Sequence, residues 1–116
     1  MWEIQWTEHC KVWISQLDEH TKEDILAHLI VLKEKGPALG RPYADTIAGS
    51  KIKNLKELRV QSKRKVIRIF FVFTRERIGL LLAGDDKRGN KRFYDQMIPA
   101  VEKIYFDWIK SNSEDS

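Results

Sequence analysis

The sequence predicts a single α+β domain, in which a small, mostly antiparallel sheet packs on two N-terminal helices and a C-terminal helix follows. Three observations predict this class. An alternating segment opens the chain, two segments with helical apolar spacing come next, and three strand-like segments precede the last helix. The length of 116 residues fits one domain that buries a core without disulfides. We expect the domain to span residues 1–110 and a polar tail to span 111–116.

The first elements are a strand and a helix. Residues 2–6 alternate between an apolar face with Trp2, Ile4 and Trp6 and a polar face with Glu3 and Gln5, which predicts a half-buried strand. Thr7 is a suitable cap for a helix that runs to about Asp18. The apolar stripe of this helix consists of Cys10, Trp13, Ile14 and Leu17.

A second helix is predicted to begin at Thr21, because Asp24 three residues later resembles a capping box. Its predicted core stripe consists of Ile25, Leu26, Leu29, Ile30 and Leu32. Gly36 and Pro37 end it. Residues 37–53 contain two prolines and two glycines with little periodicity, so we expect a loop, and loops of this length are often functional.

The remaining chain predicts a three-stranded antiparallel meander and a helix. The strands are expected at 55–61, 66–73 and 78–83, joined by a tip at 62–65 and a turn at Glu76 and Arg77. Residues 84–89 are expected to form a polar connection, and 91–109 a helix in which Pro99 either causes a kink or starts a second helix. The apolar residues in phase are Phe93, Met97, Ala100, Val101, Ile104 and Trp108.

The net charge of +4 is unevenly distributed along the chain. Residues 51–92, here called the basic segment, hold 14 Lys and Arg against 4 Asp and Glu, a local net of +10. The rest of the chain holds 7 basic and 13 acidic residues, a net of −6. A concentrated positive charge of this kind favours a nucleic-acid partner.

Strand alternation assigns two arginines of the basic segment to one face of the sheet. If Leu58 points at the helices, Arg59 points away from them together with Glu57. In 66–73 the isoleucines and Phe71 form the better core set, so Arg68 projects from the same open face as Arg59. A mid-sheet arginine requires a function or a partner. Two interpretations stay open: an anion site, or a structural ion pair with Glu57 or Asp85.

Further cations surround these strands. Lys87, Arg88, Lys91 and Arg92 follow the last strand and form either a phosphate site or a solvated loop and helix start. Tyr94 lies off the apolar stripe of its helix and either borders the core or faces these cations. With Lys56, Lys63, Arg64 and Lys65, the arrangement suits single-stranded RNA.

Several other classes are disfavoured. One cysteine excludes an intramolecular disulfide and fits a reducing, cytoplasmic location, and Cys10 is expected only to pack. No apolar run is long enough to span a membrane, and the N-terminus does not resemble a signal peptide. His9, His20 and His28 lie in the first two helices, which we expect to be away from the basic segment. No metal-ligand spacing, P-loop or nucleophile elbow occurs, and the Asp85–Asp86 pair is weak evidence for a metal nuclease.

Six short stretches form a pattern along the chain, at residues 39–42 (L-G-R-P), 55–59 (L-K-E-L-R), 66–73 (V-I-R-I-F-F-V-F), 78–84 (I-G-L-L-L-A-G), 86–89 (D-K-R-G) and 93–94 (F-Y). Together they resemble the RelE/HigB superfamily, most closely its phage-derived HigB-like branch, over essentially the whole chain. The resemblance implies a RelE-like fold with the order β-α-α-β-β-β-α. It also implies a toxin of a type II toxin–antitoxin module, which enters the ribosomal A site and cuts mRNA without a metal or cofactor.

In such a reaction the 2′-OH of the messenger attacks the adjacent phosphorus and leaves a 2′,3′-cyclic phosphate. Arg68 matches the mid-strand arginine that contacts the scissile phosphate in the family. Arg88 matches the basic residue of the loop after the last strand, and Tyr94 matches a tyrosine that orients the nucleotide or transfers a proton. Arg59 matches an arginine whose role is structural as much as catalytic.

The general base is not fixed by the resemblance. Glu57 stands where RelE-type members have a lysine proposed as the base, so Glu57 replaces it or Lys56, Lys87 or Asp86 does the work. Members that use histidine are not matched. The implied partners are the ribosome, its mRNA and a HigA-like helix-turn-helix antitoxin, with operator DNA bound only through the antitoxin and no membrane. The alternatives are a non-catalytic RNA-binding or regulatory protein of phage origin and a protein that acts only through a partner.

Overall fold

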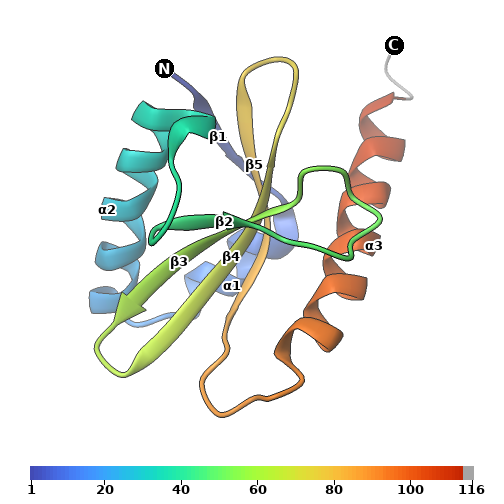
Figure 1. Ribbon diagram of the computed structural model, residues 1–116. Coiled ribbons are helices and arrows are strands. Elements are labelled where there is room, and N and C mark those ends of the chain that lie inside the picture. Colours follow the sequence, from blue (N-terminus) through green and yellow to red (C-terminus); the bar gives the residue numbers. More distant parts are fainter. Residues whose placement is uncertain (114–116) are drawn as a thin grey trace.

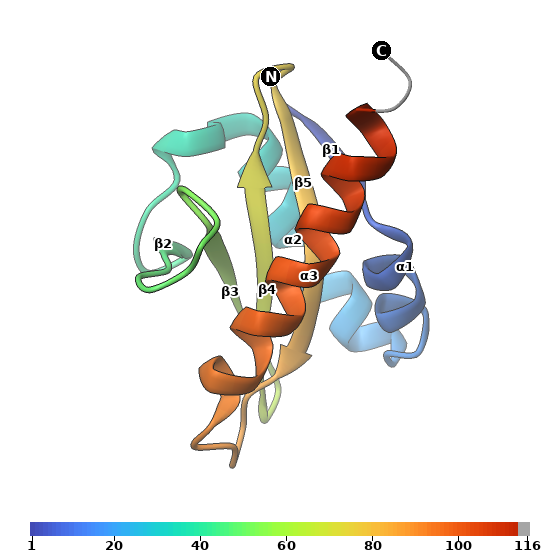
Figure 2. The same cartoon turned by 90° about the vertical axis from the view of Figure 1, so that its right-hand side faces the viewer.

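The computed structural model describes residues 1–113 and has three layers. Helices α1 (Glu8–Ser15) and α2 (Glu19–Lys35) cover one face of a five-stranded sheet, and α3 (Phe93–Ser113) crosses the other face (Figures 1 and 2). The α+β class is confirmed, and the architecture agrees with the RelE-like fold. The predicted tail falls in two parts, because 111–113 continue α3 and 114–116 lie outside the described residues.

The N-terminal elements follow the sequence pattern, except that α1 ends at Ser15 rather than near Asp18 and leaves Leu17 outside the helix. Strand β1 (Glu3–Trp6) leads into α1, and Thr7 caps that helix by accepting a 3.1 Å hydrogen bond from the Cys10 N–H. The Thr7 hydroxyl also donates to the Leu82 carbonyl oxygen over 2.7 Å, so the same residue fastens the helix start to the sheet.

Helix α2 begins earlier than predicted and buries a narrower stripe. Its N-cap is Asp18, whose carboxylate accepts from the Thr21 N–H and hydroxyl, so the assignment of the cap to Thr21 was wrong. Aspartate is among the best N-cap residues, and here its oxygens reach the N–H three residues on. Ile25, Leu29 and Leu32 are buried as predicted, whereas Leu26 and Ile30 are 58% and 60% exposed because they lie on the side of α2 away from the sheet.

The strand order is β1-β5-β4-β3-β2, with β1 parallel to β5 and every other pair antiparallel. The meander consists of β3 (Lys56–Ser62), β4 (Lys65–Phe73) and β5 (Ile78–Asp86), so it is confirmed. Strand β5 continues through Asp86, which takes Gly84, Asp85 and Asp86 out of the predicted connection. These residues stay in the sheet because Ile67, Arg68 and Ile69 of β4 are in register with them.

The predicted loop at 37–53 contains two elements. A 3₁₀ turn (Gly36–Ala38) follows α2, and a short strand β2 (Ala44–Thr46) pairs with the first half of β3. Three residues are too few to produce a visible alternation, and their partner is distant in sequence. Strand β2 lies opposite Lys56, Glu57 and Leu58 only. The second half of β3 therefore has no strand beside it on that edge.

The sheet separates two apolar cores. The core under α1 and α2 includes Leu58, Val60, Ile67, Ile69 and Phe71, and the core under α3 includes Phe70, Val72, Leu80, Leu82 and Phe93. The face predicted to be open is therefore partly covered by α3. That helix starts at Phe93 rather than Lys91, runs through Pro99 without interruption, and leaves Ala100 exposed. The part of this face that carries Arg59 and Arg68 forms the candidate site.

Candidate active site

A buried carboxylate, that of Glu57, lies at the centre of the candidate site. Its side chain is 3% exposed. Oε2 accepts a hydrogen bond from Arg59 Nε at 3.1 Å, and Oε1 accepts one from the Tyr94 hydroxyl at 2.7 Å. Arg68 Nε lies 3.6 Å from Oε1. These four residues are called the Glu57 cluster below.

Strand pairing explains why the cluster forms. Arg59 and Arg68 are directly opposite each other in the β3–β4 register, and like charges at opposed positions repel. Glu57, two residues before Arg59 on the same strand, projects from the same face and lies against both, which reduces their repulsion and leaves a net positive charge. Of the two open interpretations, the ion pair is present, and Glu57 rather than Asp85 supplies it.

Arg68 is held without a full set of hydrogen bonds. Its side chain is 13% exposed, and Nη1 donates to the Ile67 carbonyl oxygen over 3.0 Å. Its Nε is the one buried side-chain nitrogen or oxygen in residues 1–113 that lacks a hydrogen-bond partner. An unpaired buried donor costs about 1–3 kcal/mol, and the charge of Glu57 at 3.6 Å offsets part of that cost.

The charge network continues toward β2. Arg59 Nη2 lies 3.3 Å from Asp45 Oδ2, and Arg41 Nη2 lies 2.8 Å from the same oxygen. Hydrogen bonds from Arg41 and the Thr46 N–H lower the pKa of Asp45. Cationic and anionic groups thus alternate along the row from Arg41 to Arg68, which holds each guanidinium in a defined place.

Tyr94 joins the cluster from the first turn of α3. Burial, and next the hydrogen bond to Glu57, raise the pKa of its hydroxyl, so the phenol stays protonated and donates at neutral pH. The ammonium of Lys87 lies 5.3 Å from the ring centroid. Both predicted positions of Tyr94 are therefore correct, because its ring borders the core under α3 and also faces the cation Lys87.

The other predicted cations divide into two groups. Arg88 is exposed and pairs with Asp86 at 3.2 Å, while Asp86 Oδ1 accepts from the N–H groups of Val66 and Arg88. Asp86 therefore organises the loop after β5 instead of facing Glu57. Lys91 and Arg92 are exposed immediately before α3.

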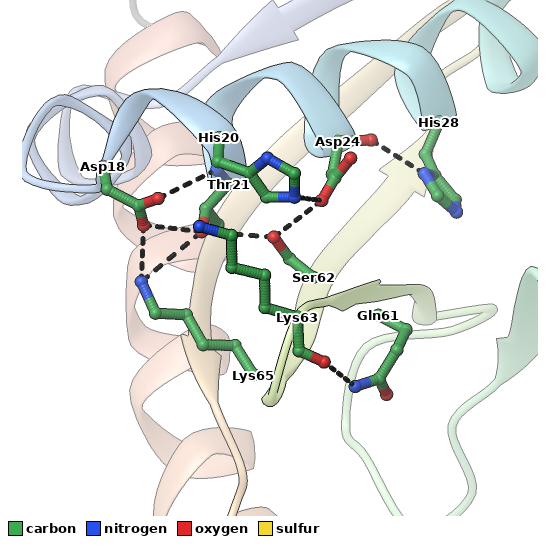
Figure 3. A network of polar contacts seen from close by, with 9 residues as sticks. All are labelled: Asp18, His20, Thr21, Asp24, His28, Gln61, Ser62, Lys63 and Lys65. Atoms are coloured by element: carbon green, nitrogen blue, oxygen red, sulfur yellow. Dashed lines mark hydrogen bonds and ion pairs between the residues drawn. The ribbon is translucent and has the colours of Figure 1, made fainter.

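The remaining four cations do not join the Glu57 cluster. Lys56 projects from the opposite face of β3 and donates to Thr46 Oγ1 over 3.1 Å. Lys63 and Arg64 are exposed at the hairpin tip. Lys65 contacts Asp18 Oδ1 at 2.6 Å, on the α2 side (Figure 3).

A surface hollow borders the cluster and was not predicted. It has a volume of about 340 Å³, lies at the uncovered edge of β3, and is here called the edge depression. Its lining consists of His28, Pro42, Tyr43, Arg59, Gln61 and Arg68. The expectation that no histidine lies near the basic segment was wrong, because α2 packs along β3 and carries His28 to its edge. The unusual length of the 37–53 loop was the sequence signal for Tyr43, and Pro42 also belongs to the L-G-R-P stretch at 39–42.

Two further properties concern the described part of the chain. Within residues 1–113, no three His, Cys, Asp or Glu side chains are grouped so that they could hold a metal ion. None of the helices in the same range combines the length and apolar character needed to cross a bilayer.

Comparison with known proteins decides the family. The protein-family model described as "Phage derived protein Gp49-like (DUF891)" matches residues 12–105 of the chain. The chain belongs to this family. This Gp49-like protein is also similar to two relatives from Mycobacterium tuberculosis (strain ATCC 25618 / H37Rv). It is 40% identical over 111 residues to "Putative toxin HigB2", covering 91% of this chain and 55% of that relative. It is 37% identical over 100 residues to "Putative toxin HigB3", covering 85% of this chain and 86% of that relative.

The Gp49-like chain thus spans about half the length of the first of these relatives. The predicted resemblance to the phage-derived, HigB-type branch is confirmed. The residues of the Glu57 cluster all lie within the matched range of 12–105.

Proposed function

We propose that this Gp49-like protein is the toxin of a type II toxin–antitoxin module and acts as a ribosome-dependent mRNA endonuclease that needs no metal. The observation that carries the proposal is the convergence of two arginines and a protonated tyrosine on one buried carboxylate beside a surface depression. The HigB names of its relatives support the toxin assignment. A HigA-like helix-turn-helix antitoxin would neutralise it and bind operator DNA.

The cluster suits the chemistry of RNA self-cleavage. The 2′-oxygen forms a bond to phosphorus as its proton leaves, and the bond from phosphorus to the 5′-oxygen breaks as that oxygen gains a proton. Two negative charges build up on the phosphorane oxygens between these events. Arg59 and Arg68 are fixed cations that stabilise such charge without reorganising. Tyr94, whose hydroxyl donates to Glu57, would orient the nucleotide or protonate the leaving 5′-oxygen.

We assign Glu57 to positioning rather than to proton removal. Its side chain is almost fully buried, and its two oxygens already accept from Arg59 and Tyr94. A base must reach the proton that it removes, and Glu57 is enclosed by its own partners. Arg88, Lys87, Lys91 and Arg92 lie on the loop and helix start next to Tyr94 and would hold the RNA backbone on either side.

The test is primer extension on mRNA from translating ribosomes that carry purified protein, with the 3′ ends of the cut RNA assayed for a 2′,3′-cyclic phosphate. We expect cuts within codons in the A site, and Arg68→Ala should lower the cleavage rate by roughly 10²–10³, the cost of removing one transition-state donor. Arg75→Ala, in the exposed β4–β5 turn, is the matched control and should cut like wild type. Circular dichroism verifies that both variants fold.

Two outcomes would contradict the proposal. Salt-sensitive RNA binding without any cleaved product would indicate the non-catalytic RNA-binding alternative. Full activity in a folded Arg68→Ala variant would remove Arg68 from the reaction.

A further inference from the structure

The edge depression has two unlike halves. One half of the lining consists of Arg59 and Arg68, and guanidinium groups suit a phosphate. The other half is formed by His28, Pro42, Tyr43 and Gln61, which present two aromatic rings, a proline ring and an amide. A cationic half beside a flat, partly apolar half fits one nucleotide, with its phosphate on the first and its base on the second.

The tyrosine of this half is exposed although it is large and aromatic. Tyr43 is 51% exposed, and its ring stands edge-on to the His28 ring at a centroid distance of 6.2 Å. Its backbone oxygen accepts a 2.8 Å hydrogen bond from the Arg59 N–H. The exposed ring is therefore tied at its backbone to the residue that would bind the phosphate.

The histidine is fixed in one orientation. His28 Nδ1 lies 2.8 Å from the Asp24 carbonyl oxygen, which only accepts hydrogen bonds. The neutral ring must then carry its proton on Nδ1, which leaves Nε2 as an acceptor. Gln61 Nε2 donates to the Lys63 carbonyl oxygen over 2.9 Å, which leaves Gln61 Oε1 as a second acceptor.

A polar network holds the two walls of the depression together (Figure 3). Ser62, which is fully buried and follows Gln61, donates to Asp24 Oδ2 over 2.7 Å. His28 is bonded to the backbone of the same Asp24, one helical turn further along α2. The α2 wall and the β3 wall are thus joined beside the depression, so His28 and Gln61 are preorganised.

We infer that the half of the edge depression formed by His28, Tyr43 and Gln61 binds an RNA base whose phosphate lies on Arg59 and Arg68. The inference rests on the proposed function for the identity of the ligand as RNA. The base stacks on Tyr43, and its amino group donates to His28 Nε2 or Gln61 Oε1. Bases that carry an exocyclic amino group are therefore preferred over uracil. A volume of about 340 Å³ is at the small end for ligand sites, which fits one nucleotide.

The first test measures binding of cytidine monophosphate, uridine monophosphate and ribose 5-phosphate to the isolated protein by NMR titration. We expect cytidine monophosphate to bind about tenfold more tightly than ribose 5-phosphate, the low end of what base stacking contributes. Uridine monophosphate should bind between the two. Tyr43→Ala should lower the affinity for cytidine monophosphate to that for ribose 5-phosphate. Tyr43→Phe should retain the difference in affinity between the two ligands.

The matched control is Phe106→Ala, which removes an exposed aromatic ring from α3. It should leave the affinities for all three ligands unchanged. The inference is overturned if cytidine monophosphate and ribose 5-phosphate bind equally, if neither binds, or if Tyr43→Ala leaves their ratio unchanged.

A second test separates this inference from the proposed function. On translating ribosomes, Tyr43→Ala should spread the cuts over more codons than wild type does. If the wild-type protein cleaves mRNA and Tyr43→Ala gives the same distribution of cuts, the base site is contradicted and the endonuclease proposal is not. An inactive wild-type protein that still discriminates between the two monophosphates and ribose 5-phosphate would contradict the endonuclease alone.

Discussion

At the scale of single residues, the Glu57 side chain contacts three other side chains of the candidate site. It accepts from Arg59 and Tyr94 and lies against Arg68, whose Nε has no hydrogen bond of its own. Removing its charge would leave two neighbouring guanidinium groups in direct repulsion. The same carboxylate therefore supports both the stability of the sheet and the geometry of the site.

Glu57→Gln should destabilise the protein by roughly 2–3 kcal/mol. Breaking a buried ion pair costs about 3–5 kcal/mol, and the partial exposure of Arg59 reduces this. Urea unfolding gives the free energy, and Glu76→Gln, in the exposed β4–β5 turn, is the control. If the two variants unfold at the same urea concentration, the cluster is not a stabilising ion-pair network.

Cys10 should not react with thiol reagents while the protein is folded. It is fully buried, and burial raises the pKa of its thiol to about 12, so almost no reactive thiolate exists at pH 8. A colorimetric disulfide reagent at pH 8 should label it only after guanidinium chloride is added. Complete labelling of the native protein within seconds would contradict the packing seen around α1.

The sequence predicts the site residues unevenly, for a physical reason. Alternation along two strong strands is a local property, and it correctly places Glu57, Arg59 and Arg68 on one face. His28 and Tyr43 come to the same place only because α2 packs along β3 and because β2 pairs with β3. No periodicity within the sequence records those contacts.

At the scale of elements, the β3–β4 hairpin is fastened to α2 by a polar clasp (Figure 3). Lys65 binds the N-cap residue Asp18, and Ser62 bonds to Thr21 and Asp24. These contacts join the start of one helix to the tip of a hairpin about 45 positions away in sequence. The clasp therefore links the end of β3 to the helix that carries His28.

The clasp should weaken in acid. Lys65 and Thr21 hold the pKa of Asp18 well below its usual range, so its folded-state pKa is lower than its unfolded-state pKa. The stabilisation is therefore complete above about pH 4, where the unfolded carboxyl is ionised, and is lost as the pH falls further. Thermal melts between pH 6 and 2 should show a smaller loss of stability in Asp18→Asn than in wild type.

Asparagine is also a good N-cap, so Asp18→Asn isolates the ion pair from the cap. Lys65→Met removes the other partner and should flatten the pH profile in the same way. Equal pH profiles for wild type and both variants would mean that the ion pair adds nothing to stability.

At the scale of the whole molecule, the fold separates its charge. The basic segment supplies three central strands and the loop before α3, and the acidic remainder supplies most of the helices. The predicted meander and helix order follow from local patterns, whereas the parallel pairing of β1 with β5 joins strands that are far apart in the sequence. The pairing of β1 with β5 and the packing of helices on both faces of the sheet depend on which apolar surfaces meet in three dimensions. Local periodicity does not give this information.

Binding to single-stranded RNA should weaken steeply with salt. The affinity for a short single strand falls with a slope of about −0.7 per phosphate contact on a double-logarithmic plot. Replacing both Lys91 and Arg92 with alanine should reduce that slope by about 1.4 if each residue contacts one phosphate. Fluorescence anisotropy at several salt concentrations measures it. The control replaces Lys11 and Lys103, which are exposed on α1 and α3, and should keep the wild-type slope.

The unpaired Nε–H of Arg68 links folding to ligand occupancy. Without a ligand, the folded protein carries the cost of one buried donor that water no longer reaches. An anion that enters the depression and draws the guanidinium toward itself would relieve that cost, so part of its binding energy would appear as resistance to unfolding. A bound anion would therefore raise the free energy of unfolding, and any ligand that occupies the depression would protect this fold from proteolysis.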